Sequence, residues 1–134
     1  MKVGILGNEG SWYGADLARA ADERGYACVR FDFPLVAASC GESPSSERNL
    51  VSSAEYGLSG FDAIIVRTMP PGSLEQVVFR MDALACLANA GVEVVNSPRS
   101  MECAVDKFLT TAKLEAVGLS VPATVTCQAS ETAM

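Results

Sequence analysis

Histidine is absent from the 134 residues of this chain. The imidazole ring is the most frequent general base in enzymes and a frequent metal ligand. Ser-His-Asp and Cys-His catalysis are therefore excluded within the chain. Any chemistry that the chain supports must use other residue types.

Basic side chains are also scarce. The chain has 10 Lys and Arg residues against 16 Asp and Glu residues, which gives a net charge of −6. Binding to nucleic acid requires clustered Lys and Arg side chains that neutralise phosphates. Because the chain is acidic and has no basic stripe, we expect no nucleic-acid partner.

Long apolar runs and closely spaced cysteines are missing as well. No stretch approaches the ~18 apolar residues of a membrane span, and the N-terminus lacks the pattern of a signal peptide. Five cysteines are present, none in C-x-x-C spacing, so neither a zinc site nor a redox dithiol is predicted. Their odd number and wide scatter fit reduced thiols. We expect a cytoplasmic protein with no membrane partner.

The apolar residues that are present, 49% of the chain, can fill the core of one domain. Short apolar runs alternate with helical periodicity, a pattern typical of βαβ units on a parallel sheet. The unbroken run Ala63–Val66 predicts a central strand buried on both faces. The four strands predicted for this α/β fold are Val3–Leu6, Ala27–Phe31, Asp62–Thr68 and Val92–Val95.

Helix signals lie between these strands. Ser73 with Gln76 three residues later forms a capping box that opens a helix reaching Asn89. Apolar periodicity predicts another helix over Gly14–Arg24, closed by Gly25. Two further helices are predicted over Arg99–Cys103 and Asp106–Ala116.

Two segments have a less regular hydropathy pattern. Residues 34–60 are rich in Pro, Gly and Ser, which predicts a long loop with a short helix around Glu47–Tyr56. After Pro122, a last strand is predicted over Ala123–Cys127, and Ser130–Met134 reads as the first turn of another helix. Because a domain seldom stops in the first turn of a helix, we expect the chain to be a fragment.

The first candidate site is the turn Gly7-Asn8-Glu9-Gly10-Ser11 after the first strand. Glycines there let backbone N–H groups approach an anion at a helix N-terminus. The G-x-G-x-x-G dinucleotide fingerprint is not present, although Asp32 stands where a ribose-binding acid can lie. A plain tight turn is the alternative. Trp12 and Tyr13 either line a pocket mouth or pack the loop.

The second candidate is Arg67, which ends the predicted central strand. Open α/β sheets place ligands at the carboxyl ends of their strands. A guanidinium at that place needs a carboxylate, a phosphate or water. A ligand site and a structural ion pair are both consistent with the sequence.

The third candidate is the segment Asn96–Lys107, in which Lys107 follows Asp106 at the start of a predicted helix. A Lys at this place is usually a solvated surface residue. It can also bring a point charge onto a nucleotide phosphate. The spacing by itself favours the surface interpretation.

Taken in order, the motifs resemble those of a known family. They are Gly-Asn-x-Gly-Ser, Arg-Thr-Met-Pro-Pro-Gly-Ser-Leu-Glu, Val-Val-Asn-Ser-Pro-Arg, Asp-Lys-Phe-Leu-Thr-Thr and Gly-Leu-Ser-Val-Pro-Ala-Thr. This order resembles ATP-grasp ligases of the RimK type, which are similar to α-L-glutamate ligases. The match covers essentially the whole chain, and its most specific part is residues 92–124.

The resemblance implies a three-layer Rossmann-like, pre-ATP-grasp domain over residues 1–96, with a four-stranded parallel sheet. Residues 97–134 would be linker helices and the first strand of a truncated ATP-grasp domain. The parent would use ATP and Mg²⁺ to phosphorylate a carboxylate, and the amine of an amino acid such as glutamate would attack the acyl phosphate. The acidic Mg²⁺ ligands of that family lie further along the chain, so the fragment alone is expected to be inactive.

By position, the resemblance places Lys107 at the nucleotide phosphates and Arg67, Asn8, Ser11 and Trp12 on the substrate side. No catalytic residue or metal ligand is assigned within the 134 residues. The expected partners are a small-molecule or peptide carboxylate and an amino acid, and we expect a homo-oligomer. Two alternatives remain: a non-catalytic, doubly wound ligand-binding or regulatory module, and a small nucleotide-dependent oxidoreductase or transferase.

Overall fold

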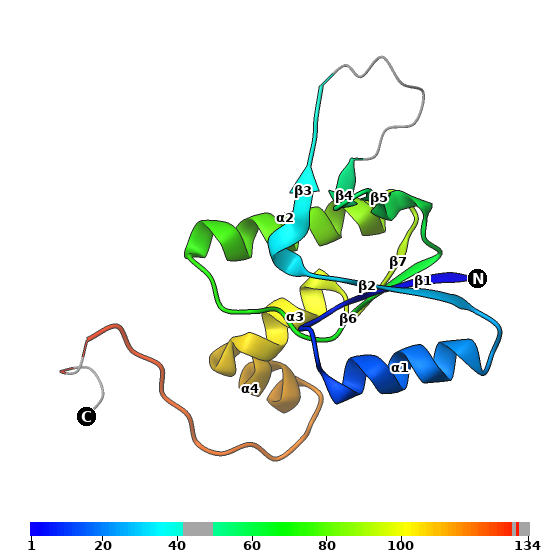
Figure 1. Ribbon diagram of the computed structural model, residues 1–134. Coiled ribbons are helices and arrows are strands. Elements are labelled where there is room, and N and C mark those ends of the chain that lie inside the picture. The colour runs from blue at the N-terminus through cyan, green and yellow to red at the C-terminus, as the bar shows by residue number, and fades with distance from the viewer. Residues whose placement is uncertain (42–49, 130, 132–134) are drawn as a thin grey trace. The chain divides into compact units, whose positions relative to one another are not determined.

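The computed structural model describes residues 1–41, 50–129 and 131, and it divides into two compact units, 1–98 and 99–134. The first unit contains the predicted parallel sheet (Figure 1). Its four strands are β1 (Lys2–Leu6), β2 (Ala27–Phe31), β6 (Ala63–Val66) and β7 (Glu93–Val95). The four-stranded parallel α/β fold is thus confirmed.

The order of the strands in this sheet is β2-β1-β6-β7, and all of its pairs are parallel. The helices α1 (Trp12–Asp22) and α2 (Leu74–Asn89) lie on opposite sides of the sheet (Figure 1). Parallel strands require such covered faces, because their crossover connections place helices on the sheet. The unit is therefore a three-layer α/β structure.

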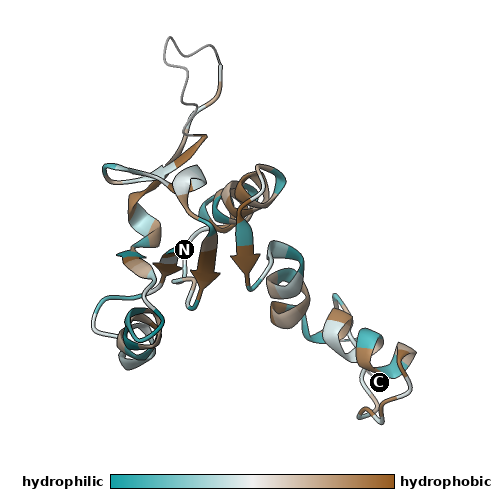
Figure 2. Ribbon diagram, turned by 90° about the vertical axis from the view of Figure 1, so that its right-hand side faces the viewer, coloured by the Kyte–Doolittle hydropathy of each residue, from teal (hydrophilic) through white to brown (hydrophobic). Residues whose placement is uncertain are grey.

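The core of the first unit includes side chains on both faces of the sheet and on α2. Ile5, Leu6 and Ile64 are 0–2% exposed on the strands, and Leu84 and Leu87 are 1–2% exposed on α2. In Figure 2 the strands are accordingly the most hydrophobic part of the ribbon. Full burial of one such side chain contributes about 1.5–3 kcal/mol, so these residues stabilise the layering directly.

The start of α2 has the capping box that the sequence predicts. The Ser73 hydroxyl accepts a hydrogen bond from the Gln76 backbone N–H at 3.3 Å, and the Gln76 side chain accepts one from the Ser73 N–H at 3.0 Å. Two backbone donors without helical partners are thereby satisfied. Gly25, with φ +69°, takes the left-handed conformation after α1 that its position predicts.

We expect Ser73→Ala to lower the free energy of unfolding by about 1 kcal/mol, because the helix loses its cap. Urea denaturation followed by circular dichroism measures this loss. Ser73→Asp is the matched control, since aspartate also caps and should stay close to the wild type. Equal stability of the Ala and Asp variants would contradict the role of this cap.

Residues 50–57 correct the predicted helix around Glu47–Tyr56. They contain β4 (Val51–Ser53) and β5 (Tyr56–Gly57), which form an antiparallel sheet with β3 (Val36–Ala38). Short 3₁₀ turns flank this sheet at Phe33–Leu35 and Leu58–Gly60. The part of the prediction in 42–49 lies outside the described residues.

The prediction was wrong because burial alternates along β4, but one of its buried residues is polar, so hydropathy does not follow the alternation. Val51 and Ser53 are 0% and 1% exposed, whereas Ser52 between them is less buried. The buried serine makes a period-two strand look like a polar loop. Contacts among the aromatic rings of Phe31, Tyr56 and Phe61 join two distant parts of the sequence, β2 and residues 56–61.

The second unit contains α4 (Lys107–Ala116) and all of α3 (Pro98–Val105) except its first residue. Asp106 caps α4, because its carboxylate accepts a hydrogen bond from the Leu109 N–H at 2.9 Å. The predicted strand Ala123–Cys127 is wrong: this stretch is irregular. A strand requires a neighbour to complete its ladder of hydrogen bonds, and the described part of this unit supplies none. The helix turn predicted at 130–134 falls almost wholly outside the described residues.

Candidate functional site

The carboxyl ends of the four parallel strands lie along one edge of the sheet. The chain runs from β1 to β2 on one side of β1, and β6 and β7 follow on its other side. The order of strands therefore reverses between β1 and β6, and open α/β sheets bind ligands at such a switch point. Here the pairing of Leu6 with Val66 brings the turn after β1 beside the exit of β6.

The turn after β1 presents an exposed, polar segment at this switch point. Gly7 is buried and its N–H donates to the Phe31 carbonyl at 3.2 Å, while Asn8, Glu9 and Gly10 are exposed. A Cβ at position 7 would lie 3.6 Å from Arg67 Cβ, so the turn lies directly against Arg67. Ser11 is at the N-cap position of α1, but its side chain makes no capping hydrogen bond.

Arg67 is held against an aromatic ring. Its Cζ atom lies 4.0 Å from the centroid of the Tyr13 ring. Trp12 stacks on Tyr13 with a centroid separation of 4.0 Å and an interplanar angle of 29°. In the part of the chain that the structure describes, no carboxylate forms an ion pair with Arg67. The structural ion pair that the sequence left open is therefore not found there.

The arginine near the end of the neighbouring strand β2 is paired with an acid. Arg30 forms an ion pair with Asp32 at 2.5 Å and donates to the Gly7 carbonyl at 3.3 Å. The pKa of the Arg30 guanidinium is raised, chiefly by the hydrogen bond to Asp32, with Glu9 adding a smaller favourable charge interaction. Arg30 thus braces the glycine turn through the Gly7 carbonyl, and its guanidinium is already paired with Asp32.

Two residues that received no predicted role position this edge of the sheet. Asn96, after β7, donates to the Val66 carbonyl at 3.0 Å and joins the ends of β7 and β6. Arg80 on α2 is 7% exposed and donates to the Pro70 carbonyl at 2.7 Å, which fixes the loop after Arg67. An arginine in an apolar stretch of helix was the available signal for the latter.

Lys107 lies in the second unit, as the first residue of α4, and is exposed. A cation at a helix N-terminus faces the positive end of the helix dipole, which is an unfavourable place for it. Among the described residues no acid forms an ion pair with Lys107. Its ammonium group is therefore available to an external anion.

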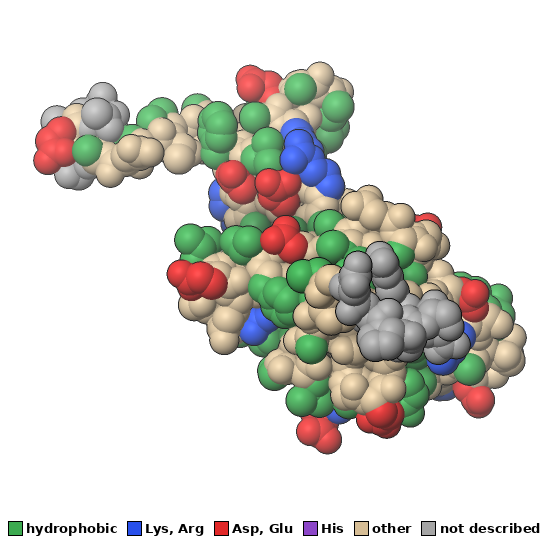
Figure 3. Space-filling view, turned by 90° about the horizontal axis from the view of Figure 1, so that it is seen from above, with side chains coloured by type: hydrophobic (Ala, Val, Ile, Leu, Met, Phe, Trp, Pro, Cys, Tyr) green, Lys and Arg blue, Asp and Glu red, His purple; other side chains and the backbone are tan. Residues whose placement is uncertain are grey.

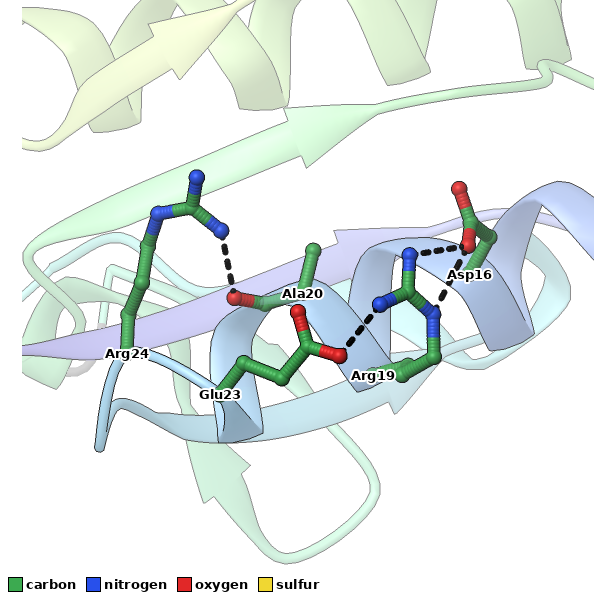
Figure 4. A network of polar contacts seen from close by, with 5 residues as sticks. All are labelled: Asp16, Arg19, Ala20, Glu23 and Arg24. Atoms are coloured by element: carbon green, nitrogen blue, oxygen red, sulfur yellow. Dashed lines mark hydrogen bonds and ion pairs between the residues drawn. The ribbon is translucent and has the colours of Figure 1, made fainter.

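Other charged side chains form ion pairs or hydrogen bonds with each other or with the backbone on the surface. On α1, Arg19 pairs with Asp16 at 2.7 Å and with Glu23 at 2.5 Å, and Arg24 donates to the Ala20 carbonyl (Figure 4). The hydrogen bonds to Asp16 and Glu23 raise the pKa of Arg19. In the face drawn in Figure 3, the coloured residues show no continuous basic stripe. Such exposed ion pairs are solvated by water and do not indicate a binding site.

Neither a metal cluster nor a membrane span is found in the residues that the structure covers. No three His, Cys, Asp or Glu side chains lie together there as ligands of an ion. None of the described helices has the length and hydropathy needed to cross a membrane.

The cysteines differ in expected reactivity. Burial raises the pKa of the Cys28 thiol, whereas Cys40 and Cys127 are exposed. Since the thiolate is the nucleophile and a raised pKa lowers its fraction, Cys28 should be alkylated by iodoacetamide more slowly than Cys40 and Cys127 at pH 8. Its rate should still be rising with pH at pH 9. Peptide mass spectrometry over time measures both rates, and faster labelling of Cys28 would contradict this expectation.

Comparison with known proteins supports the resemblance seen in the motifs. The chain is 35% identical over 134 residues to tetrahydromethanopterin:alpha-L-glutamate ligase from Methanosarcina acetivorans, covering 99% of this chain and 41% of that protein. No family model matches the chain. The resemblance to a glutamate ligase is confirmed by this similarity.

Solved structures of ATP-grasp ligases share the fold. The ligase PsnB, complexed with precursor peptide PsnA2 and AMPPNP, matches with a TM-score of 0.65 at 19% identity, covering 90% of this chain and 45% of that one. The macrocyclase MdnC, bound with precursor peptide MdnA from Microcystis aeruginosa MRC, matches with a TM-score of 0.62 at 18% identity, covering 99% and 48%. The chain spans less than half the length of each of these relatives.

Proposed function

We propose that this chain is the substrate-side part of an ATP-dependent carboxylate–amine ligase that adds glutamate to an acceptor carboxylate. The observation that carries the proposal is the 35% identity to a glutamate ligase over essentially the whole chain. The polar edge between β1 and β6 supports it, because it leaves an unpaired guanidinium and a glycine turn at the switch point.

In the proposed reaction, the γ-phosphoryl group of ATP is transferred to an oxygen of the acceptor carboxylate, which forms an acyl phosphate and ADP. The amine of glutamate then attacks the carbonyl carbon, and phosphate leaves as the amide bond forms and the amine loses a proton. Positioning and charge neutralisation supply most of the catalysis in such a transfer. This chemistry is compatible with a chain that has no histidine.

The residues of this chain have two proposed tasks. We assign Arg67, Asn8, Ser11 and Trp12 to the acceptor side, because they stand at or beside the carboxyl ends of β1 and β6. We assign Lys107 to the nucleotide phosphates, because its ammonium group is exposed at the start of α4. The structure describes no cluster of acids that would hold Mg²⁺, and we propose that its ligands belong to a further domain.

The test is a comparison of two proteins: these 134 residues, and the same chain extended by the following ~200 residues, roughly one further domain. Each is supplied with Mg²⁺-ATP, glutamate and a tetrahydromethanopterin-type acceptor, and ADP and the glutamylated product are measured. We expect product formation only with the extended protein. If the extended protein binds Mg²⁺-ATP but forms neither ADP nor product with any carboxylate acceptor, the chain belongs instead to a non-catalytic binding module.

A further inference from the structure

We propose that Tyr13 is a positioning residue that holds the guanidinium of Arg67 flat, and that Arg67 so held binds a carboxylate of the acceptor. The proposal rests on the proposed function only for the identification of that carboxylate as the acceptor's. The binding of a carboxylate to this site requires neither ATP nor turnover, so it can be tested separately.

The first observation is the contact of three planar groups. The Tyr13 ring contacts both the Arg67 guanidinium and the Trp12 indole. Arg67 Cζ and the centroid of the Trp12 ring each lie 4.0 Å from the centroid of the Tyr13 ring. A guanidinium over an aromatic ring loses rotational freedom while its N–H groups stay at its edge. Arg67 is thereby preorganised for the two parallel hydrogen bonds that a carboxylate accepts.

The second observation is a contrast between two arginines at the same edge of the sheet. Arg30 is paired with Asp32, and Glu9 contributes its charge to Arg30. Arg67 has no such carboxylate among the residues that the structure describes. Its donors are therefore free for an external anion, and Asp32 at the same edge is already paired with Arg30.

The third observation is that the two aromatic rings are exposed to solvent. Trp12 and Tyr13 are 65% and 45% exposed, although both are large aromatic side chains. A ring buried in the core would serve packing, whereas an exposed ring beside an unpaired cation serves mainly to orient that cation. The site also lies at the switch point between β1 and β6, where the fold places ligands.

The experiment uses the fluorescence of Trp12, which is the only tryptophan of the chain and lies within the stack. The 134-residue protein is titrated with sodium glutarate at constant ionic strength, and with the uncharged diol of the same chain length, 1,5-pentanediol. We expect a saturable change with glutarate and none with the diol. A response to the diol equal to that to glutarate would overturn the assignment of a carboxylate.

Four variants test the roles of the two residues. Arg67→Gln should raise the apparent Kd for glutarate by about 10-fold or more, because the charged hydrogen bonds are lost. Tyr13→Leu should raise it by roughly 5-fold through loss of the cation–π platform. Tyr13→Phe, which keeps the ring, should restore affinity to within about 2-fold. Arg99→Gln, which removes an exposed arginine in the other unit, is the charge control and should leave the Kd unchanged.

Unchanged affinity in Arg67→Gln would overturn the site, and equal affinities of Tyr13→Leu and the wild type would overturn the positioning role. If Tyr13→Leu does not fold, Arg67→Lys replaces it. Lysine keeps the charge but not the flat fork, so we expect weaker binding than in the wild type, and equal binding would contradict the need for a held plane. Should glutarate bind as expected while the extended protein forms no amide, only the proposed ligase function fails.

Discussion

Replacing Gly4 by valine is expected to lower the free energy of unfolding by about 3 kcal/mol, the upper part of the range for overpacked cores. Gly4 is in the middle of β1, between β2 and β6. A Cβ placed there would lie 2.5 Å from Ile64 Cδ1 and 2.9 Å from Phe31 Cε2. Ile64 and Phe31 are 0% and 4% exposed, so neither has open space into which it can move.

Gly60→Ala is the matched control for this prediction. Its Cβ would meet nothing within 4 Å, and Gly60 does not have a positive φ. That replacement should be neutral, or stabilising by about 0.4–1 kcal/mol through the unfolded state. Chemical denaturation of both variants measures the difference. If Gly4→Val is as stable as Gly60→Ala, the close contact of β1 with Ile64 and Phe31 is not a constraint of the fold.

The second large effect concerns ligand affinity in the extended protein. Lys107→Ala should weaken Mg²⁺-ATP binding by about 10- to 100-fold, the value of a charge-assisted hydrogen bond to a phosphate. It should leave the acceptor affinity close to that of the wild type. Arg67→Ala should have the reverse pattern, because Arg67 is assigned to the acceptor. Calorimetric titration of each variant with both ligands measures the two affinities.

Lys113→Ala is the control for Lys107, since it removes a lysine from the last turn of the same helix. Stability separates a binding role from a structural one. The Lys107 ammonium lies at the unfavourable end of the α4 dipole, so its removal should leave the helix as stable as before or slightly more so. Losses of both affinities to the same extent in Lys107→Ala and Arg67→Ala would contradict these assignments.

Much of the parallel fold could be predicted because its signals are local. The apolar run Ala63–Val66 requires a strand covered on both faces, and Ser73 with Gln76 defines the start of α2 through hydrogen bonds within four residues. The small antiparallel sheet could not be predicted in this way. The burial of Ser53 depends on packing against residues distant in sequence, which hydropathy along β4 does not contain.

The candidate site was likewise predicted only in part from the sequence. The order of residue types placed Arg67 and the glycine turn at strand ends, since the carboxyl end of a strand is readable from where its apolar run stops. Whether Arg67 would meet an acid or a ligand was left open by the sequence. The fold answers that question for the described residues: the Arg67 guanidinium contacts Tyr13, which lies 54 residues earlier in the chain, and Asp32 pairs with Arg30 instead.

The sequence by itself therefore determined the α/β class, the succession of the four parallel strands and their helices, the capping box of α2 and the resemblance to ATP-grasp ligases. Each of these depends on residues close together in the chain or on the order of motifs. Only the tertiary structure decided which charges are paired, which glycine is confined by its neighbours, and that β4 belongs to a second sheet. These features depend on distances between segments far apart in sequence, and such distances arise only when the strands are registered and the helices packed.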